Sequence, residues 1–134
     1  MRSVIKKRIK NIYKYSKETM KSEETKPPRI YLSGPITGYD LTERYDTFLA
    51  KQLSLEAKGW AVANPLRNGL SPTSNYREHM RRDISMLLEC DAVLFMTGFL
   101  YSNGCRTEFD VATACGLDVY FEESFNIGSV KKMV

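Results

Sequence analysis

Residues 92–121 constrain the fold of this chain more than any other stretch. Residues 92–96 form a short, unbroken apolar run, which is typical of a strand buried on both faces of a parallel sheet. Residues 102–104 have the composition of a helix start, and Gly116 is a typical helix end. With an apolar segment over 118–121, the stretch predicts a strand, a loop, a helix and a second strand.

One acidic residue of this predicted helix lies on its inward face. Glu108 shares that face with Cys105, Ala112 and Cys115, which we expect to turn towards the sheet. A buried carboxylate costs several kcal/mol unless it is paired, hydrated or used. We interpret Glu108 as a functional residue near the helix start, where free N–H groups and the helix dipole favour its ionised form.

The same alternation of strands and helices extends over the preceding residues. Strands are expected over 29–33 and 60–63, and helices over about 41–58 and 75–89. This order predicts a three-layer, doubly wound α/β domain of the flavodoxin or Rossmann-like type. Its parallel sheet would have four or five strands in the order 2-1-3-4(-5), with a ligand site beyond the carboxyl ends of strands one and three.

Several features of these elements converge on that predicted site. The loop after the first strand contains Gly34 and Gly38, which allow a ligand to approach the backbone closely. The loop over 64–75 is too long for a simple turn and is a candidate for lining the site. The helix over 41–58 is expected to bury the apolar positions Leu41, Tyr45, Phe48, Leu49 and Leu53.

A second carboxylate lies on the apolar face of the helix over 75–89. Asp83 falls between Met80 and Leu87, and it could reach the crevice at the switch point. From the helix pattern alone, a functional aspartate and a buried one satisfied by backbone amides or a neighbouring arginine remain equally open.

The positive net charge of the chain comes entirely from its N-terminal residues. Residues 1–29 carry ten Lys and Arg against three Glu, whereas residues 30–134 carry ten against thirteen Asp and Glu. We divide the chain into a basic leader and linker over 1–28, expected to be poorly ordered, and a domain over 29–134. A basic arm can bind nucleic acid or a membrane surface, but a solvated extension is the simpler interpretation. Met20 is an equally good start, and an amphipathic helix through Val4, Ile5, Ile9, Ile12 and Tyr13 is a further possibility.

Composition also narrows the cellular setting and the chemistry. No apolar run is long enough to span a bilayer, the start lacks a secretory signal, and three cysteines without metal or redox spacing indicate a reduced, cytoplasmic setting. The single histidine, His79, is expected on a helix surface, so no metal site is predicted. No phosphate-binding loop, dinucleotide fingerprint or hydrolase nucleophile elbow occurs, and no cofactor is expected. An ionised carboxylate in a partly dry crevice can instead attack an anomeric carbon and hold it as an ester.

Three groups of residues form one pattern: the run Tyr31-Leu32-Ser33-Gly34-Pro35, then Asp83 with the segment 90–93, then Ser102 and Gly104 followed by Glu108. This pattern resembles the nucleoside 2-deoxyribosyltransferase superfamily. The resemblance covers about 29–122 and lies nearest to a small phage and bacterial branch, with nucleotide N-glycosidases as relatives. It implies a nucleoside or nucleotide substrate, an enzyme of the transferase or glycosidase type, and a homodimer or larger oligomer. A membrane or nucleic-acid partner is not expected.

The resemblance also implies roles for individual residues. Glu108 would be the nucleophile on C1′ of the sugar, Tyr31 would position it, and Asp83 would serve the base or the proton transfer to it. The implied substrate-binding residues are Ser33, Gly34, Pro35, Gly38, Ser102, Asn103 and Gly104. Family transferases carry an acidic residue after strand three, and the segment 97–101 has none. The resemblance therefore supports N-glycosidic bond chemistry in general more strongly than transfer of the sugar between bases. The alternative is a non-catalytic nucleotide-binding or sensing domain that uses the same crevice.

Overall fold

The computed structural model describes residues 26–123, and the strands in this range form a single parallel sheet. The strands are β1 (Arg29–Ser33), β2 (Ala61–Ala63), β3 (Ala92–Phe95) and β4 (Asp118–Phe121), in the order β2-β1-β3-β4. Every neighbouring pair is parallel, and Ser33 of β1 lies opposite Phe95 of β3. The predicted fold class and strand order are therefore confirmed, with four strands in the described part of the chain.

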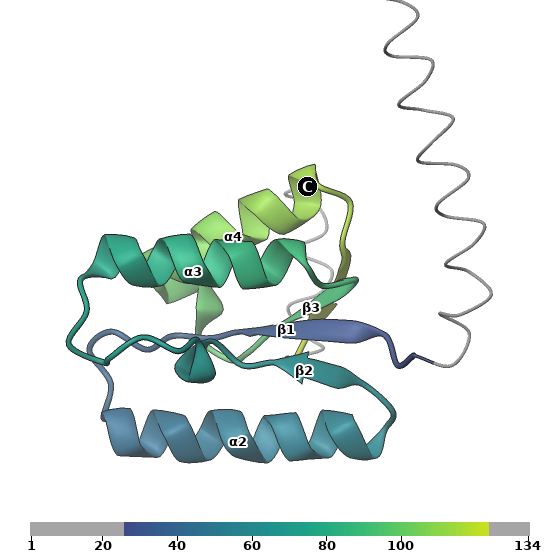
Figure 1. Cartoon of the computed structure of the whole chain (residues 1–134), viewed down its shortest axis with the longest axis horizontal. Helices are drawn as coiled ribbons and strands as arrows, with labels where there is room; N and C mark the ends of the chain where they lie inside the picture. Colours follow the sequence, from purple (N-terminus) through teal and green to yellow (C-terminus); the bar gives the residue numbers. More distant parts are fainter. Residues whose placement is uncertain (1–25, 124–134) are drawn as a thin grey trace, which may run out of the picture.

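Helices cover both faces of this sheet (Figure 1). Helix α2 (Leu41–Ala57) lies on one face, and α3 (Tyr76–Leu88) and α4 (Asn103–Ala114) lie side by side on the other. Two 3-10 turns, η1 (Pro65–Arg67) and η2 (Phe99–Tyr101), follow β2 and β3 at their carboxyl ends. All the connections between parallel strands therefore pass through helices, as the alternating pattern predicted.

Strand β1 divides its side chains between two hydrophobic cores. Ile30 and Leu32 pack with Phe48 and Leu55 of α2, whereas Tyr31 faces α3 and α4. Successive side chains of a strand point to opposite faces, so Ser33 lies on the same face as Tyr31. Two polar side chains are thereby directed from the sheet towards α4.

Helix α2 packs on the sheet through a different face from the predicted one. Of the five expected positions only Phe48 is buried, together with Leu55 two turns later. The other four, at intervals of four residues, are exposed: Leu41, Tyr45, Leu49 and Leu53. The helix carries two apolar stripes, and contact with the β1 and β3 side chains selects the stripe that holds Phe48 and Leu55.

Two further expectations need correction or lie outside the described residues. Cys115 does not share the inward face of α4, because the helix ends at Ala114 and Cys115 is an exposed C-cap. Residues 1–25 of the basic leader, with its possible amphipathic helix, and the last eleven residues lie outside the described range. No helix among residues 26–123 combines the length and apolar character that a membrane crossing needs.

Candidate active site

The Glu108 carboxyl group lies in the second turn of α4, not at its very start. Ser102 is the N-cap of this helix, and its Oγ accepts a hydrogen bond from the Cys105 amide at 3.3 Å. Asn103 and Gly104 follow as the first helical residues, so Glu108 is the sixth. Because helix-dipole effects fall off within the first turn, side chains must stabilise this carboxylate.

Two hydroxyl groups from β1 hold the Glu108 carboxyl group. Ser33 Oγ donates to Glu108 Oε1 at 2.9 Å, and the Tyr31 hydroxyl donates to Oε2. Tyr31 and Ser33 are fully buried and Glu108 is 5% exposed. The sheet therefore fixes both oxygens of a nearly buried carboxylate.

Burial and hydrogen bonding have opposite effects on the ionisation of Glu108. The pKa of Glu108 is raised to about 7, because burial and the nearby charge of Asp83 raise it more than the hydrogen bonds from Tyr31 and Ser33 lower it. Burial and the Glu108 charge raise the pKa of Tyr31, which keeps the phenol protonated as a donor. The expectation that Glu108 stays ionised is thus corrected, because the group titrates near neutral pH.

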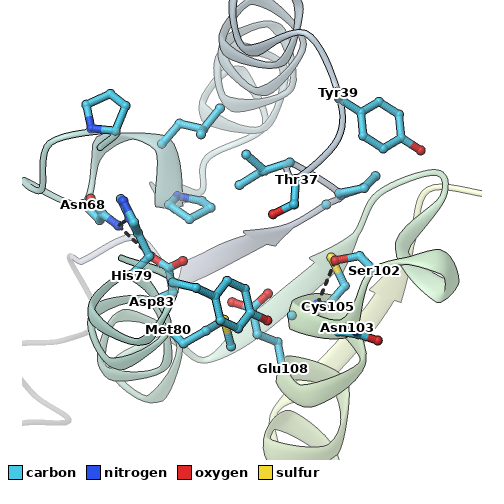
Figure 2. Close-up of a pocket in the computed structure, with 18 of the residues that line it drawn as sticks. Thr37, Tyr39, Asn68, His79, Met80, Asp83, Ser102, Asn103, Cys105 and Glu108 are labelled. Carbon is cyan, nitrogen blue, oxygen red and sulfur yellow. Dashed lines mark hydrogen bonds between the residues drawn. The ribbon is translucent and has the colours of Figure 1, made fainter. Parts of the chain in front are cut away.

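Glu108 lines a cavity of about 600 Å³ at the carboxyl ends of β1, β2 and β3 (Figure 2). Asp83 of α3 and Glu108 of α4 project into it from adjacent helices. The volume is within the usual range for small-molecule sites. Much of the remaining wall is aromatic or apolar and suited to a flat ring, through Tyr39, Leu41, Tyr45, Leu66, Leu70, Tyr76, Met80 and Tyr101.

The cavity brings together most of the residues that the sequence pointed to. Gly34, Pro35, Ser102, Asn103 and Gly104 line it with Asp83 and Glu108. Ser33 and Tyr31 do not line it, because they lie behind Glu108 and bind its carboxyl group. Gly38 is also absent from the lining, and it has a positive φ of 87° in the turn before α2.

Gly34 lines the cavity and is also too closely packed to carry a side chain. A Cβ atom at this position would lie 3.0 Å from Phe48 Cζ and 3.1 Å from Met96 Sδ. Real Cβ atoms rarely approach heavy atoms this closely. The absence of a side chain therefore lets the loop after β1 pass between Phe48 of α2 and Met96, the residue that follows β3.

Asp83 is held by a residue that the sequence did not single out. Asn68, in the loop after η1, donates from Nδ2 to Asp83 Oδ1 at 2.9 Å. Burial raises the pKa of Asp83, and the Asn68 hydrogen bond lowers it. The loop over 64–75 was expected to line the site, and its richness in polar residues was the signal that could have identified Asn68.

His79 was expected on a helix surface, but the structure places it at the cavity. It is half-buried and lines the cavity, with Nδ1 3.0 Å from Asn68 Nδ2 and Nε2 3.1 Å from the Ser71 carbonyl oxygen. Among residues 26–123 no group of three or more His, Cys, Asp or Glu side chains could hold a metal ion. Asp83, Glu108, Asn68 and His79 contribute two carboxyl groups, an amide and an imidazole to the cavity lining.

Most of the described residues match a single protein family. Residues 28–121 match the family described as "Domain of unknown function (DUF4406)". The chain belongs to the DUF4406 family. The matched residues contain every strand of the sheet and both carboxylates of the cavity, and no curated protein matches the chain.

Solved structures share the fold of this DUF4406 domain. A 2-desoxiribosyltransferase from Leishmania mexicana matches with a TM-score of 0.55 and 21% identity, over 71% of this chain and 63% of that chain. A conserved protein from Enterococcus faecalis V583 matches with a TM-score of 0.54 and 22% identity, over 80% of this chain and 74% of that chain. The Clostridium botulinum CMP N-glycosidase BcmB matches with a TM-score of 0.52 and 22% identity, over 78% of this chain and 81% of that chain. The resemblance to the deoxyribosyltransferase superfamily is thus confirmed for the fold, although the DUF4406 chain spans less than two thirds of the transferase.

Proposed function

We propose that this protein is an enzyme that cleaves or exchanges the N-glycosidic bond of a nucleoside or nucleotide. The observation that carries the proposal is the Glu108 carboxyl group, held by two buried hydroxyl donors at the wall of a cavity that a second carboxylate shares. The similar structures of a 2-desoxiribosyltransferase and a CMP N-glycosidase support this chemistry through their common fold.

The reaction begins with Glu108 as the nucleophile. Its ionised carboxylate attacks C1′ of the sugar, and the C1′–N bond breaks with its electron pair passing to the nitrogen of the base. Asp83 gives that nitrogen a proton, a role that its raised pKa suits. The charge of Asp83 raises the pKa of Glu108, so the ionised nucleophile is favoured when Asp83 carries the proton.

The second step decides between hydrolysis and exchange. Water or a second base attacks C1′, its proton passes to Asp83, and the ester bond breaks to restore the Glu108 carboxylate. Ser102, Asn103 and Gly104 lie at the start of α4 and face the cavity, where they are placed to contact the sugar or a 5′-phosphate. The aromatic residues of the wall are placed to stack on the base.

The proposal is tested by incubating the protein with a panel of nucleosides and 5′-nucleotides, with and without a second base. Release of free base is measured by chromatography, and acid-quenched samples are analysed by mass spectrometry for a glycosyl adduct on the peptide containing Glu108. We expect Glu108→Gln to lower base release by orders of magnitude and to abolish the adduct, because it removes the nucleophile. Glu56→Gln, at an exposed glutamate of α2 outside the cavity, is the matched control.

Two further variants refine the assignment. Glu108→Asp moves the carboxylate by about an ångström and is expected to lose ~100-fold. Asp83→Asn should lose less than Glu108→Gln if Asp83 only orients the base. Full activity of Glu108→Gln would end the nucleophile hypothesis, and nucleotide binding without base release would favour the non-catalytic binding domain.

A further inference from the structure

The side-chain amide of Asn68 makes three hydrogen bonds, with Leu70, Asp83 and His79. Figure 2 shows the two contacts towards Asp83 and His79. Asn68 Oδ1 accepts from the Leu70 amide at 3.0 Å, and because an amide N–H only donates, the oxygen must face Leu70. The two hydrogens of Nδ2 are then directed at Asp83 Oδ1, 2.9 Å away, and at His79 Nδ1, 3.0 Å away. Asn68 is 5% exposed, so this arrangement leaves it no alternative partner in water.

The two neighbours of His79 specify its protonation state. Asn68 Nδ2 is a donor, so Nδ1 of the ring must accept, whereas the Ser71 carbonyl oxygen can only accept, so Nε2 must carry a hydrogen. Both contacts require the same neutral tautomer, with the proton on Nε2. An imidazolium would place a second N–H against the Asn68 amide and lose that hydrogen bond.

The Asn68 contact leaves one oxygen of Asp83 for the cavity. Asp83 is 9% exposed and lines the cavity, and its Oδ1 is bound by Asn68. Within residues 26–123, Oδ2 of Asp83 has no hydrogen-bond donor. Arg82, which precedes Asp83 on α3, donates from Nε to the Asn68 backbone carbonyl at 3.0 Å and links the loop to the same helix.

We infer that Asn68 is the positioning residue of Asp83, braced by neutral His79, and that it directs Asp83 Oδ2 at the group leaving the sugar. The part of this inference that concerns the leaving group rests on the proposed function, whereas the tautomer and the carboxylate contact do not. Asn68 touches Asp83 rather than the substrate, so its effect on the reaction passes through the aspartate. Its loss should therefore lower kcat more than it changes KM.

The chain contains a matched control for Asn68. Asn64 is also buried, at 6% exposure, and its Oδ1 also accepts from the amide two residues later, at 3.0 Å from Leu66. Its Nδ2, however, donates to Gln52 Oε1 of α2 and the residue does not line the cavity. Substitutions at Asn64 and Asn68 thus disturb equivalent turns, but only the second disturbs Asp83.

The first experiment needs no substrate and uses the fact that the chain has one histidine. Long-range ¹H–¹⁵N spectra of the full chain report the tautomer of the neutral ring directly, and the expected result is the Nε2–H form. Asn68→Asp replaces the donor by an acceptor, so Nδ1 of the ring should gain a proton while Nε2 keeps its own, and the Asp83 pKa, followed by ¹³C carboxyl titration, should rise. Asn64→Asp should leave both signals at their wild-type values.

The second experiment measures base release by the same variants. Asn68→Ala is expected to lose about 10- to 100-fold in kcat, as for a misplaced catalytic group, while Asn64→Ala retains wild-type kcat. An Nδ1–H tautomer in the wild-type protein would overturn the inference even if every Asn68 variant failed to fold. Equal effects of the two asparagines on kcat would also overturn it. If no substrate is turned over but the tautomer and the Asp83 shift appear, the proposed function fails and the positioning contact stands.

Discussion

Ser33 Oγ donates a hydrogen bond to Glu108 Oε1 across 2.9 Å, although the two residues lie 75 positions apart in the chain. This contact and the Tyr31 hydroxyl stabilise the ionised carboxylate, while burial stabilises the neutral acid. The balance places the pKa of Glu108 at about 7 instead of its usual 4.5. The protonation of Glu108 should therefore affect both stability and activity near neutral pH.

The stability of the folded domain should fall as the pH rises from about 4.5 to about 7. Glu108 binds its proton more tightly in the folded than in the unfolded chain, so its contribution is full below pH 4.5 and is lost above pH 7. A shift of this size corresponds to about 3 kcal/mol. Thermal midpoints of Glu108→Gln relative to wild type should be several degrees higher at pH 8.5 than at pH 5. Equal differences at both pH values would contradict the raised pKa.

Base release should increase with pH as Glu108 ionises around pH 7, and it should fall again where Asp83 loses the proton that it gives to the base. Glu108 must be ionised to attack C1′, and its pKa of about 7 sets the midpoint of the rise. The measurement is kcat/KM between pH 5 and 9 with the best substrate of the panel. A rate that is constant across this range would exclude Glu108 as the titrating group.

Ser33→Ala should move that midpoint to higher pH. The substitution removes a donor that favours the ionised carboxylate, so burial acts with less opposition. Ser85→Ala is a suitable control, because the exposed Ser85 hydroxyl donates to a backbone carbonyl of its own helix. A midpoint unchanged in Ser33→Ala would mean that the hydroxyl has no electrostatic effect on Glu108.

Two glycines of the cavity should respond differently to alanine. Gly34→Ala places Cβ 3.0 Å from Phe48 Cζ and should destabilise the domain by about 1–3 kcal/mol through overpacking. A Cβ atom at Gly104 would lie 3.3 Å from Met80 Sδ and from the Tyr76 hydroxyl and 3.9 Å from Ser102 Oγ, all side-chain atoms, and alanine favours the helix. Gly104→Ala should therefore keep the thermal midpoint and raise KM by narrowing the cavity. Denaturation curves and substrate titrations separate the two effects, and equal destabilisation would refute the assignment.

Self-association remains a prediction, and the exposed apolar side chains of α2 offer a surface for it. Phe99 is buried in the core, whereas Leu49 and Leu53 of α2 are 41% and 57% exposed and continue the stripe that reaches the cavity through Leu41 and Tyr45. We expect a homodimer or larger oligomer in sedimentation at micromolar concentration, which Leu53→Lys weakens. Leu88→Lys, at an equally exposed leucine at the end of α3, is the control. A wild-type monomer would contradict the prediction and any site shared between subunits.

The sequence determined the elements and their order, because each depends on periodicity and capping within a few residues. The alternation of strands and helices gave the parallel sheet, and Asp40, Asn75 and Ser102 each cap a helix as polar residues at such positions do. Glu108 and Asp83 were recognisable because a carboxylate on an apolar helix face is costly without a partner. The inward direction of both followed from spacing alone.

Only the tertiary structure decided which partners those carboxylates meet. The partners of Glu108 come from β1, 75 and 77 positions away, and their reach depends on how the sheet and α4 pack together. Asn68 reaches Asp83 across 15 positions because the loop after β2 folds back on α3, and no local pattern encodes that path. The buried face of α2 was predicted wrongly for the same reason. Two apolar faces of this helix satisfy the same helical period, and only contact with β1 and β3 distinguishes them.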